Sequence, residues 1–246
     1  MLKAVHSDTL PDQIFGQLIR EIFSGRYGPG STLPSERALS ELFGVNRHGV
    51  REALKRLEQV GLVRIAHGGS TQILDFRRSA GLDALALIAE HADAVEDLSS
   101  MLPLLQSALE MRAGIGVDVA RLCAERAGPG ERANITAAAE DLAAAEGPAA
   151  LALDERFWQC LVDGAGNIAY QLAFNSLMRG VRALPALSLE WLERELQLSD
   201  HRRTIARAIT AGDPEAAVRA TREALAPAAE LVTSPLATTA RAERAT

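Results

Sequence analysis

The first quarter of the chain alternates apolar and polar residues with the period of short helices. Within residues 10–23 the apolar positions recur three or four residues apart, which is the spacing of an amphipathic helix. A turn rich in glycine and proline follows, and the segment "ERALSELFG" then predicts a second, shorter helix. Ser35 is placed to cap its start and Gly44 to end it, because serine accepts hydrogen bonds from exposed backbone N–H groups and glycine tolerates left-handed backbone.

A third helix is predicted from Asn46, its expected cap, to about Val60. When it is drawn at about 100° per residue, its apolar residues share one arc and its basic residues share the opposite arc. The segments "GLVRIA" and "STQILD" then predict two short strands joined by "HGG". The apolar arc consists of Val50, Ala53, Leu54, Leu57 and Val60, and the basic arc of Arg47, His48, Arg51 and Lys55.

This order of elements predicts a winged helix-turn-helix unit. In such a unit the second helix enters the DNA major groove, where arginines near its start can reach the O6 and N7 edge of guanine. Glycines at the tip of the strand pair let the backbone approach phosphate, and His67 could enter the minor groove. The alternative is a merely solvated basic face, whose Arg–Glu pairs add only a few tenths of a kcal/mol. Four basic groups with only Glu52 beside them, together with the wing, favour DNA binding.

The distribution of charge favours the same interpretation. The chain has a formal net charge of −6, which argues against a protein that coats nucleic acid. Residues 1–80 nevertheless hold 11 Lys and Arg against 8 Asp and Glu, whereas the remainder holds 15 against 24. A basic first third on an acidic body indicates a local contact with nucleic acid.

The rest of the chain predicts a second, all-helical part, so the fold class is mainly α. After a first domain of residues 1–76, residues 77–92 have helical periodicity and predict a linker helix. Residues 93–232 are rich in Ala, Leu, Glu and Arg and are interrupted by Gly and Pro, with Asp213 as the expected cap of one helix. Residues 233–246 are small and polar, which predicts a disordered tail.

The reactive residues give no support for an enzyme. Three of the five histidines lie in the head or the N-terminal arm, and no serine or cysteine has a recognisable base beside it. Cys123 and Cys160 fit neither a metal-ligand pair nor a disulfide scaffold, and Cys160 is expected to be a buried small hydrophobe. The chain starts without an apolar signal core and has no apolar run near the ~20 residues that span a membrane. We therefore expect a cytoplasmic protein without membrane contact.

The stretch "LPSERALSELFGVNRHGVREALKRLEQVGLVRIAHGGST" resembles the winged-helix head of the GntR family of bacterial transcription regulators. The motif is long and ordered, so it is far more specific than a helix-turn-helix pattern alone. The resemblance implies that the main groove contacts are Arg37, Arg47 and Arg51. It also implies supporting roles for Asn46, His48 and Gly49, and a wing contact made by His67 with Gly68.

The resemblance continues into the second part of the chain. The segment "HGGSTQILDFRRSAGLDALALIAE" is similar to the wing and linker of the FadR branch, which senses fatty acyl-CoA. More loosely, "LALDERFWQCLVDGAGNIAYQLAFNSLMRG" and "HRRTIARAITAGDPEAAVRATREAL" resemble the all-helical effector domain, of FCD type, that the wider FadR subfamily shares. That resemblance implies six or seven helices around a ligand cavity.

Many members of the subfamily hold a divalent metal with one aspartate and three histidines in that cavity. Asp154 and His201 match two of these positions, whereas Trp158 and Ala224 occupy the other two and cannot bind a metal. Two ligands are too few, so we predict neither a metal nor another cofactor. The indole and the methyl group should make the cavity apolar, which suits a chain-like ligand. Arg112 is similar to an arginine that faces the cavity in relatives, and it could pair with a carboxylate, phosphate or thioester oxygen.

Simpler roles compete with ligand binding at these positions. Asp154 and His201 could instead be partners in a buried polar pair, and Trp158 could simply fill the core. The sequence predicts a ligand-responsive transcription regulator that is a homodimer and binds a palindromic double-stranded DNA operator. An effector would shift the two heads and change operator affinity by ~1–3 kcal/mol. The expected effector is an acyl-CoA or a fatty acid; the alternatives are a small organic acid or no effector.

Overall fold

The structure is a computed structural model with two separate units. Contacts within the chain divide it into residues 1–96 and residues 97–246. No helix in the described part of the chain is long and apolar enough to cross a membrane. The residues that the structure describes are 10–66, 70–90, 102–145, 147, 149–183 and 200–233.

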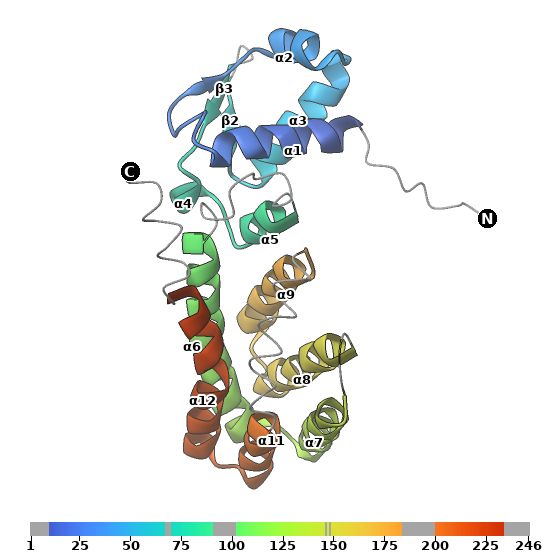
Figure 1. Ribbon diagram of the computed structural model, residues 1–246, viewed down its shortest axis with the longest axis vertical. Coiled ribbons are helices and arrows are strands. Elements are labelled where there is room, and N and C mark those ends of the chain that lie inside the picture. Colours follow the sequence, from blue (N-terminus) through green and yellow to red (C-terminus); the bar gives the residue numbers. More distant parts are fainter. Residues whose placement is uncertain are drawn as a thin grey trace, which may run out of the picture. The chain divides into compact units, whose positions relative to one another are not determined.

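The N-terminal unit combines three helices, a small antiparallel sheet and two further short helices (Figure 1). The three helices surround one apolar core, to which α1, α3 and the sheet contribute fully buried side chains. The elements of the N-terminal unit in chain order are α1 (Leu10–Phe23), β1 (Thr32–Leu33), α2 (Glu36–Phe43), α3 (Arg47–Gln59), β2 (Val63–Ile65), β3 (Thr71–Ile73), α4 (Phe76–Ser79) and α5 (Asp83–Glu90).

The predicted caps of α2 and α3 are confirmed. The Ser35 side chain accepts a hydrogen bond from the Ala38 N–H at 3.2 Å, and Gly44 ends α2 with a left-handed φ of 65°. The Asn46 side chain accepts from the Gly49 N–H at 2.9 Å and so starts α3. These local signals fix the turn between the two helices, because each satisfies backbone groups that a helix end leaves exposed.

The sheet has one more strand than the sequence predicted. β2 and β3 pair antiparallel, as expected, but β1 also pairs with β3, so the strand order is β1-β3-β2. β1 lies inside the stretch that was interpreted as a turn. A strand of two residues has no alternation to detect, and its pairing depends on Leu33, which is buried in the core against the other elements.

The expected linker helix over residues 77–92 is replaced by two short helices, α4 and α5, within the described residues up to 90. Ala80 is extended and interrupts the helical periodicity. The start of this segment packs on the turn after α3: a Cβ on Gly61, whose φ is 75°, would lie 2.4 Å from the Ser79 carbonyl oxygen. The Ser79 hydroxyl also donates to the Gly61 carbonyl at 2.7 Å, so the two segments are joined by close backbone contact.

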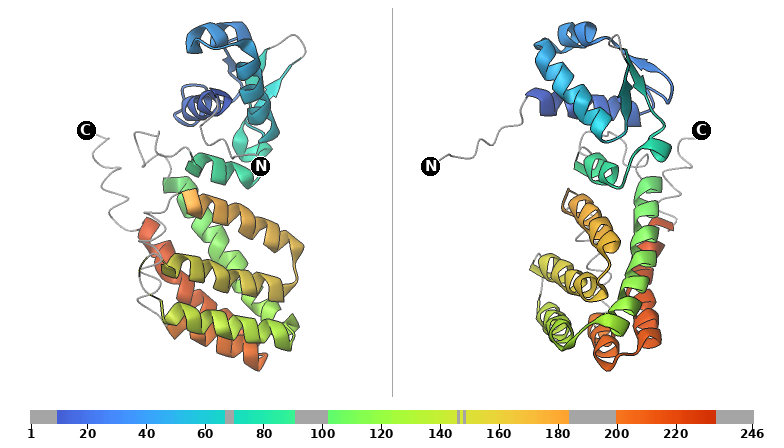
Figure 2. Two further views of the ribbon diagram at one scale, coloured as in Figure 1. Left: turned by 90° about the vertical axis from the view of Figure 1, so that its right-hand side faces the viewer. Right: turned by 180° about the vertical axis from the view of Figure 1, so that it is seen from behind.

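The C-terminal unit is all-helical in its described part, as predicted. The long helix α6 lies beside α12, and α7, α8 and α9 stack in order along it (Figure 2). α11 packs between α7 and α12. The helices are α6 (Leu102–Arg126), α7 (Pro129–Ala143), α8 (Ala149–Ala165), α9 (Ile168–Ala183), α11 (Asp200–Ala211) and α12 (Pro214–Thr233).

Small residues let these helices approach closely. A Cβ on Gly116 of α6 would lie 2.9 Å from Cδ1 of Leu225 on α12 and 3.6 Å from the Trp158 ring on α8. The predicted cap of α12 is confirmed, because Asp213 accepts from the Ala216 N–H at 2.9 Å. Of the predicted tail, residues 233–246, only Thr233 lies within the described residues, and it ends α12.

Candidate DNA-binding face and effector site

The two sides of α3 differ as the sequence predicted. Val50, Ala53, Leu54 and Leu57 have no exposed surface and pack into the core with α1, while Val60 is partly buried beside them. The opposite side is exposed along its whole length. That exposed side presents Arg47, His48, Arg51 and Lys55.

The basic groups of this face have more acidic neighbours than the sequence suggested. Lys55 contacts Glu52 at 3.1 Å, as expected, but Arg51 makes a two-point contact with Glu36 of α2, at 2.8 and 3.2 Å. The expectation that only Glu52 lies beside the basic face was therefore wrong. The missed contact joins residues on different helices, so it follows from how α2 packs on α3 and not from the period of α3.

The other predicted DNA contacts fall into three groups. Arg37 is exposed on α2 and pairs with Glu41 at 2.9 Å. Asn46 is engaged as the cap of α3, and Gly49 is buried facing α1, so both shape the start of the helix. Arg47 and His48 lie in the first turn of α3. Neither makes a hydrogen bond or an ion pair within the described part of the chain. The wing residues His67 and Gly68 lie outside the described residues.

The interior of the C-terminal unit holds a buried ion pair. The Arg202 Nε donates to Asp154 Oδ1 at 2.9 Å, and the two side chains are only 3% and 10% exposed. Asp154 comes from α8 and Arg202 from α11, so the pair joins two helices inside the domain. A buried carboxylate needs such a partner, because desolvation of an unpaired charge is very costly.

Trp158 lies next to this pair, one turn after Asp154 on α8. Its ring centre is 5.2 Å from the Arg202 guanidinium and 5.6 Å from that of Arg112, distances typical of cation–π contacts. Phe157 packs edge-on against the indole at 5.7 Å. The structure thus brings together Asp154, Trp158 and Arg112 of the predicted effector site.

Several buried polar atoms of the C-terminal unit have no hydrogen-bond partner within the described part of the chain. They include Nε1 of Trp158, Nδ1 of His201 and Oγ1 of Thr221, the last with no exposed surface. Ala224 lies one turn after Ala220 on the same buried side of α12 and belongs to the same apolar cluster as Trp158. Buried polar groups are normally satisfied, and of these atoms Trp158 Nε1 belongs to the ring that lies against Arg202 of the buried ion pair, so we take this part of the interior as the candidate effector site.

Two details of the predicted effector site change. Asp154 pairs with Arg202 and not with His201, so the suggested Asp–His pair is wrong. The region is also less apolar than replacing two histidines implied, because Arg202 brings a guanidinium into it. The sequence contained a usable signal: Arg202 has the same helical spacing as the buried residues Ile205, Ala206 and Ile209.

The residues present do not fit a metal site. Trp158 and Ala224 offer no ligand, and the carboxylate of Asp154 is already held by a guanidinium. No group of three or more His, Cys, Asp or Glu side chains in the described part of the chain could hold a metal ion. Metal content itself stays a prediction.

The cysteines are poor nucleophiles. Burial raises the pKa of the Cys123 thiol to about 12 and also raises the pKa of Cys160. Cys123 is fully buried, whereas Cys160 is only half-buried, which corrects the expectation that it is enclosed. A thiol attacks as the thiolate, so neither side chain is activated for covalent chemistry.

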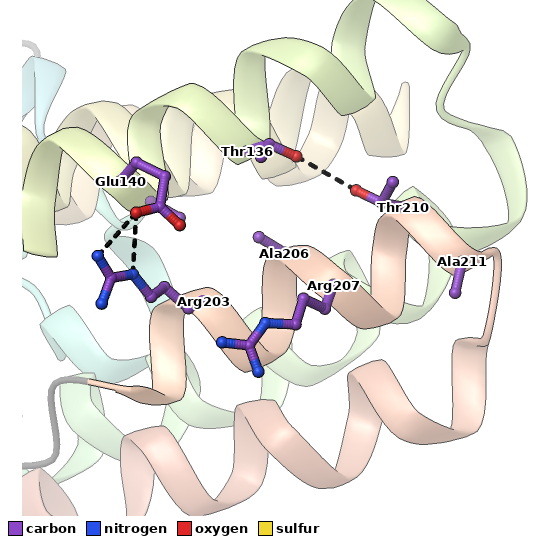
Figure 3. A pocket seen from close by; sticks show the side chains of 8 residues that line it. Thr136, Glu140, Arg203, Ala206, Arg207, Thr210 and Ala211 are labelled. Carbon is purple, nitrogen blue, oxygen red and sulfur yellow. Dashed lines mark hydrogen bonds and ion pairs between the residues drawn. The ribbon is translucent and has the colours of Figure 1, made fainter.

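A pocket of about 330 Å³ lies elsewhere, between α7 and α11 (Figure 3). Arg203 pairs with Glu140 across it at 2.7 Å, and the hydroxyls of Thr136 and Thr210 lie 3.3 Å apart at its other end. None of the predicted effector residues lines it. The pocket and the buried ion pair are therefore different places in the domain.

A winged helix-turn-helix head with an exposed basic recognition helix, followed by a helical domain with a buried polar site, defines a DNA-binding transcription regulator. Residues 10–73 match the family described as "Bacterial regulatory proteins, gntR family", and residues 107–226 match the FCD domain. The chain is similar to the HTH-type transcriptional regulator Mce2R of Mycobacterium tuberculosis, at 36% identity over 228 residues, 91% of this chain and 92% of the relative. This chain belongs to the GntR family of transcription regulators and is not an enzyme.

Two further proteins are similar to this chain. The "Fatty acid metabolism regulator protein" of Edwardsiella ictaluri is 37% identical over 163 residues, 65% of this chain and 64% of that protein. A solved structure, "Streptococcus agalactiae GntR", has 22% identity and a TM-score of 0.45, covering 89% of this chain and 99% of the other.

Proposed function

We propose that this regulator reads its operator with the exposed side of α3. The observation that carries the proposal is the contrast across that helix, which fully buries four apolar residues on one side and exposes four basic groups on the other. Arg47 and Arg51 are assigned to guanine edges and Arg37 to the flanking groove. His48 supports them, and Asn46 and Gly49 set the start of the helix. The wing residues His67 and Gly68 are assigned to the minor groove and the backbone.

The proposal includes a homodimer on a palindrome. A single head covers one short half-site, and a two-fold protein doubles this contact on two-fold DNA. Because its target is chromosomal DNA, we assign the protein to the cytoplasm.

The effector is proposed to be an acyl-CoA or a fatty acid that binds beside the Asp154–Arg202 pair. Support comes from the relatives named as fatty acid metabolism regulators and from the cationic groups near Trp158. An acidic head group would contact Arg112 and the unpartnered Trp158 N–H. Its acyl chain would lie against the apolar cluster that includes Ala224, with His201 at the rim.

A small organic acid is the second candidate, and the buried ion pair favours it. Arg202 puts charge where an apolar lining was expected, and a small carboxylate or phosphate would be held by polar contacts alone. The two candidates differ in one property, because only a lipid gains affinity with chain length.

The recognition assignment is tested with Arg47→Ala and Arg51→Ala. Each removes a base-edge contact worth ~1–3 kcal/mol, so affinity for the operator should fall by that amount while the fold persists. The operator is first obtained by selection of duplexes from a randomised pool with the full-length protein. Fluorescence anisotropy then gives the affinity, and circular dichroism reports the fold.

Arg26→Ala is the matched control for this test. Arg26 is also an exposed arginine of the same unit, but it pairs with Glu21 near the end of α1 and not with the basic face. It should leave operator affinity unchanged. Normal binding by both α3 variants would contradict the assignment of α3 as the recognition helix.

A further inference from the structure

Glu36, the first residue of α2, contacts the arginine that we assign to base reading. Arg51 Nη2 donates to Glu36 Oε2 at 2.8 Å, and Arg51 Nε donates to Oε1 at 3.2 Å. The Glu36 side chain is 21% exposed and that of Arg51 is 57% exposed. The carboxylate is thus largely covered, whereas the guanidinium remains open to a ligand.

The two hydrogen bonds use one side of the guanidinium and leave another side free. Arginine has five N–H donors in a planar fork. The Glu36 carboxylate accepts from Nε–H and from one N–H of Nη2. The edge formed by Nη1 and the second N–H of Nη2 remains available to another acceptor. Two donors on one edge are what guanine needs at O6 and N7. The carboxylate therefore fixes the plane of Arg51 without occupying a guanine-binding edge.

The same carboxylate weakens contacts with phosphate. The hydrogen bond from Arg51 lowers the pKa of Glu36, burial opposes this, and the charges of Arg51, Arg47 and Lys55 lower it further, so Glu36 is ionised. A negative charge in a basic face cancels part of the attraction that drives sequence-independent binding. On DNA without the right base, Arg51 would have to leave Glu36 to reach a phosphate.

We propose that Glu36 is a specificity-determining positioning residue, which aims Arg51 at guanine and suppresses binding to DNA that lacks the operator sequence. This inference rests on the proposed role of Arg51 in base reading. Glu36 is not itself a base contact in this account, and it acts through the guanidinium that it holds.

The test compares two duplexes with the full-length protein. One is the duplex selected by the wild type from a randomised pool, and the other is a scrambled duplex of the same base composition. In Glu36→Gln the ratio of the affinity for the selected duplex to that for the scrambled duplex should fall by about tenfold, because one arginine is no longer aimed at guanine and can contact phosphate on any sequence. Most of the fall should come from tighter binding to the scrambled duplex. The slope of that binding against log salt should steepen by about one, because Arg51 becomes free to contact a phosphate.

Three variants separate this role from general effects. Glu21→Gln removes the same charge from the same unit, where Glu21 pairs with Arg26, and it should leave the ratio and the salt slope unchanged. In an Arg51→Ala background, Glu36→Gln should no longer alter the ratio, because its target is gone. Glu36→Asp keeps a carboxylate and should retain most of the discrimination; circular dichroism checks that each variant is folded.

The outcomes distinguish this inference from the proposal beneath it. If Arg51→Ala binds the selected duplex as tightly as the wild type, Arg51 does not read DNA and the proposed recognition is at fault. If Arg51→Ala weakens binding but Glu36→Gln leaves the ratio intact, the role of Glu36 is overturned and Arg51 keeps its role. An equal effect of Glu21→Gln, or equal losses in the Asp and Gln variants, would also overturn it.

Discussion

At the scale of single residues, the Asp154–Arg202 pair needs a reason to exist. Two charges with so little exposure lose most of their hydration, and an apolar pair of similar volume would often stabilise a domain equally well. Retaining the ion pair is understandable if its charge serves binding. The neighbouring Trp158 and Arg112 would add an aromatic surface and a second cation for the proposed effector.

Removing one member of this pair should be costly. Arg202→Ala leaves Asp154 as a buried charge without its counter-ion, so the free energy of unfolding should fall by about 3–5 kcal/mol. Urea unfolding followed by circular dichroism measures the change. The second variant Asp154→Asn, which removes the charge but keeps the shape, should restore part of this stability when it is combined with Arg202→Ala.

The adjacent arginine is the matched control for that measurement. Arg203 also pairs with a carboxylate, that of Glu140, but its side chain is 35% exposed at the surface pocket between α7 and α11. Exposed pairs contribute about 0–1 kcal/mol, so Arg203→Ala should change stability little. Equal losses in the two alanine variants would show that the buried position of Arg202 has no special effect.

At the scale of elements, the sequence predicted helices that local signals define. α2 and α3 each have a cap residue, a consistent apolar period and an ending glycine or turn. All of these signals could be recognised in the sequence. β1 and the break between α4 and α5 were not, because both depend on contacts between segments far apart in sequence. Leu33 is a strand residue only because β3 lies beside it.

Apart from the effector residues that the family resemblance implied, the candidate site was predicted only as far as the period of each residue's own helix showed. The exposed cations of α3 followed from its period. The Glu36–Arg51 contact and the Asp154–Arg202 pair each join two helices, so no single period contained them. The spacing of Arg202 fits an interior position, although charged side chains are usually solvated and so rarely predicted there.

The metal prediction depends on four positions that lie on three different helices. α8 supplies Asp154 and Trp158, α11 supplies His201 and α12 supplies Ala224, so only two of four positions can bind a metal. Purified protein dialysed without chelator should therefore carry no stoichiometric zinc, nickel or manganese in elemental analysis. One metal per chain that is lost on His201→Ala would contradict this view of the site.

At the scale of the whole molecule, regulation requires that the effector distinguish two states. A ligand in the C-terminal unit would alter DNA affinity only by its unequal affinity for the DNA-bound and released arrangements of the proposed dimer. By linkage, operator DNA must then weaken effector binding by the same factor. A ligand that binds tightly but equally to both states would have no effect on the operator.

The effector prediction uses this coupling as its readout. Each buried methylene contributes about 0.8 kcal/mol, so a lipid effector should release the operator more readily as its acyl chain lengthens, until the site is full. The measurement is a fluorescence-anisotropy titration of bound operator with acyl-CoAs from acetyl to stearoyl, with free coenzyme A as the control. Arg112→Ala should weaken the release by long-chain acyl-CoA, because it removes a cation for the polar end, and it should leave ligand-free DNA binding nearly intact. A flat response across the series would contradict the lipid assignment and favour the small organic acid, whose polar contacts with Arg112 and Trp158 do not depend on chain length.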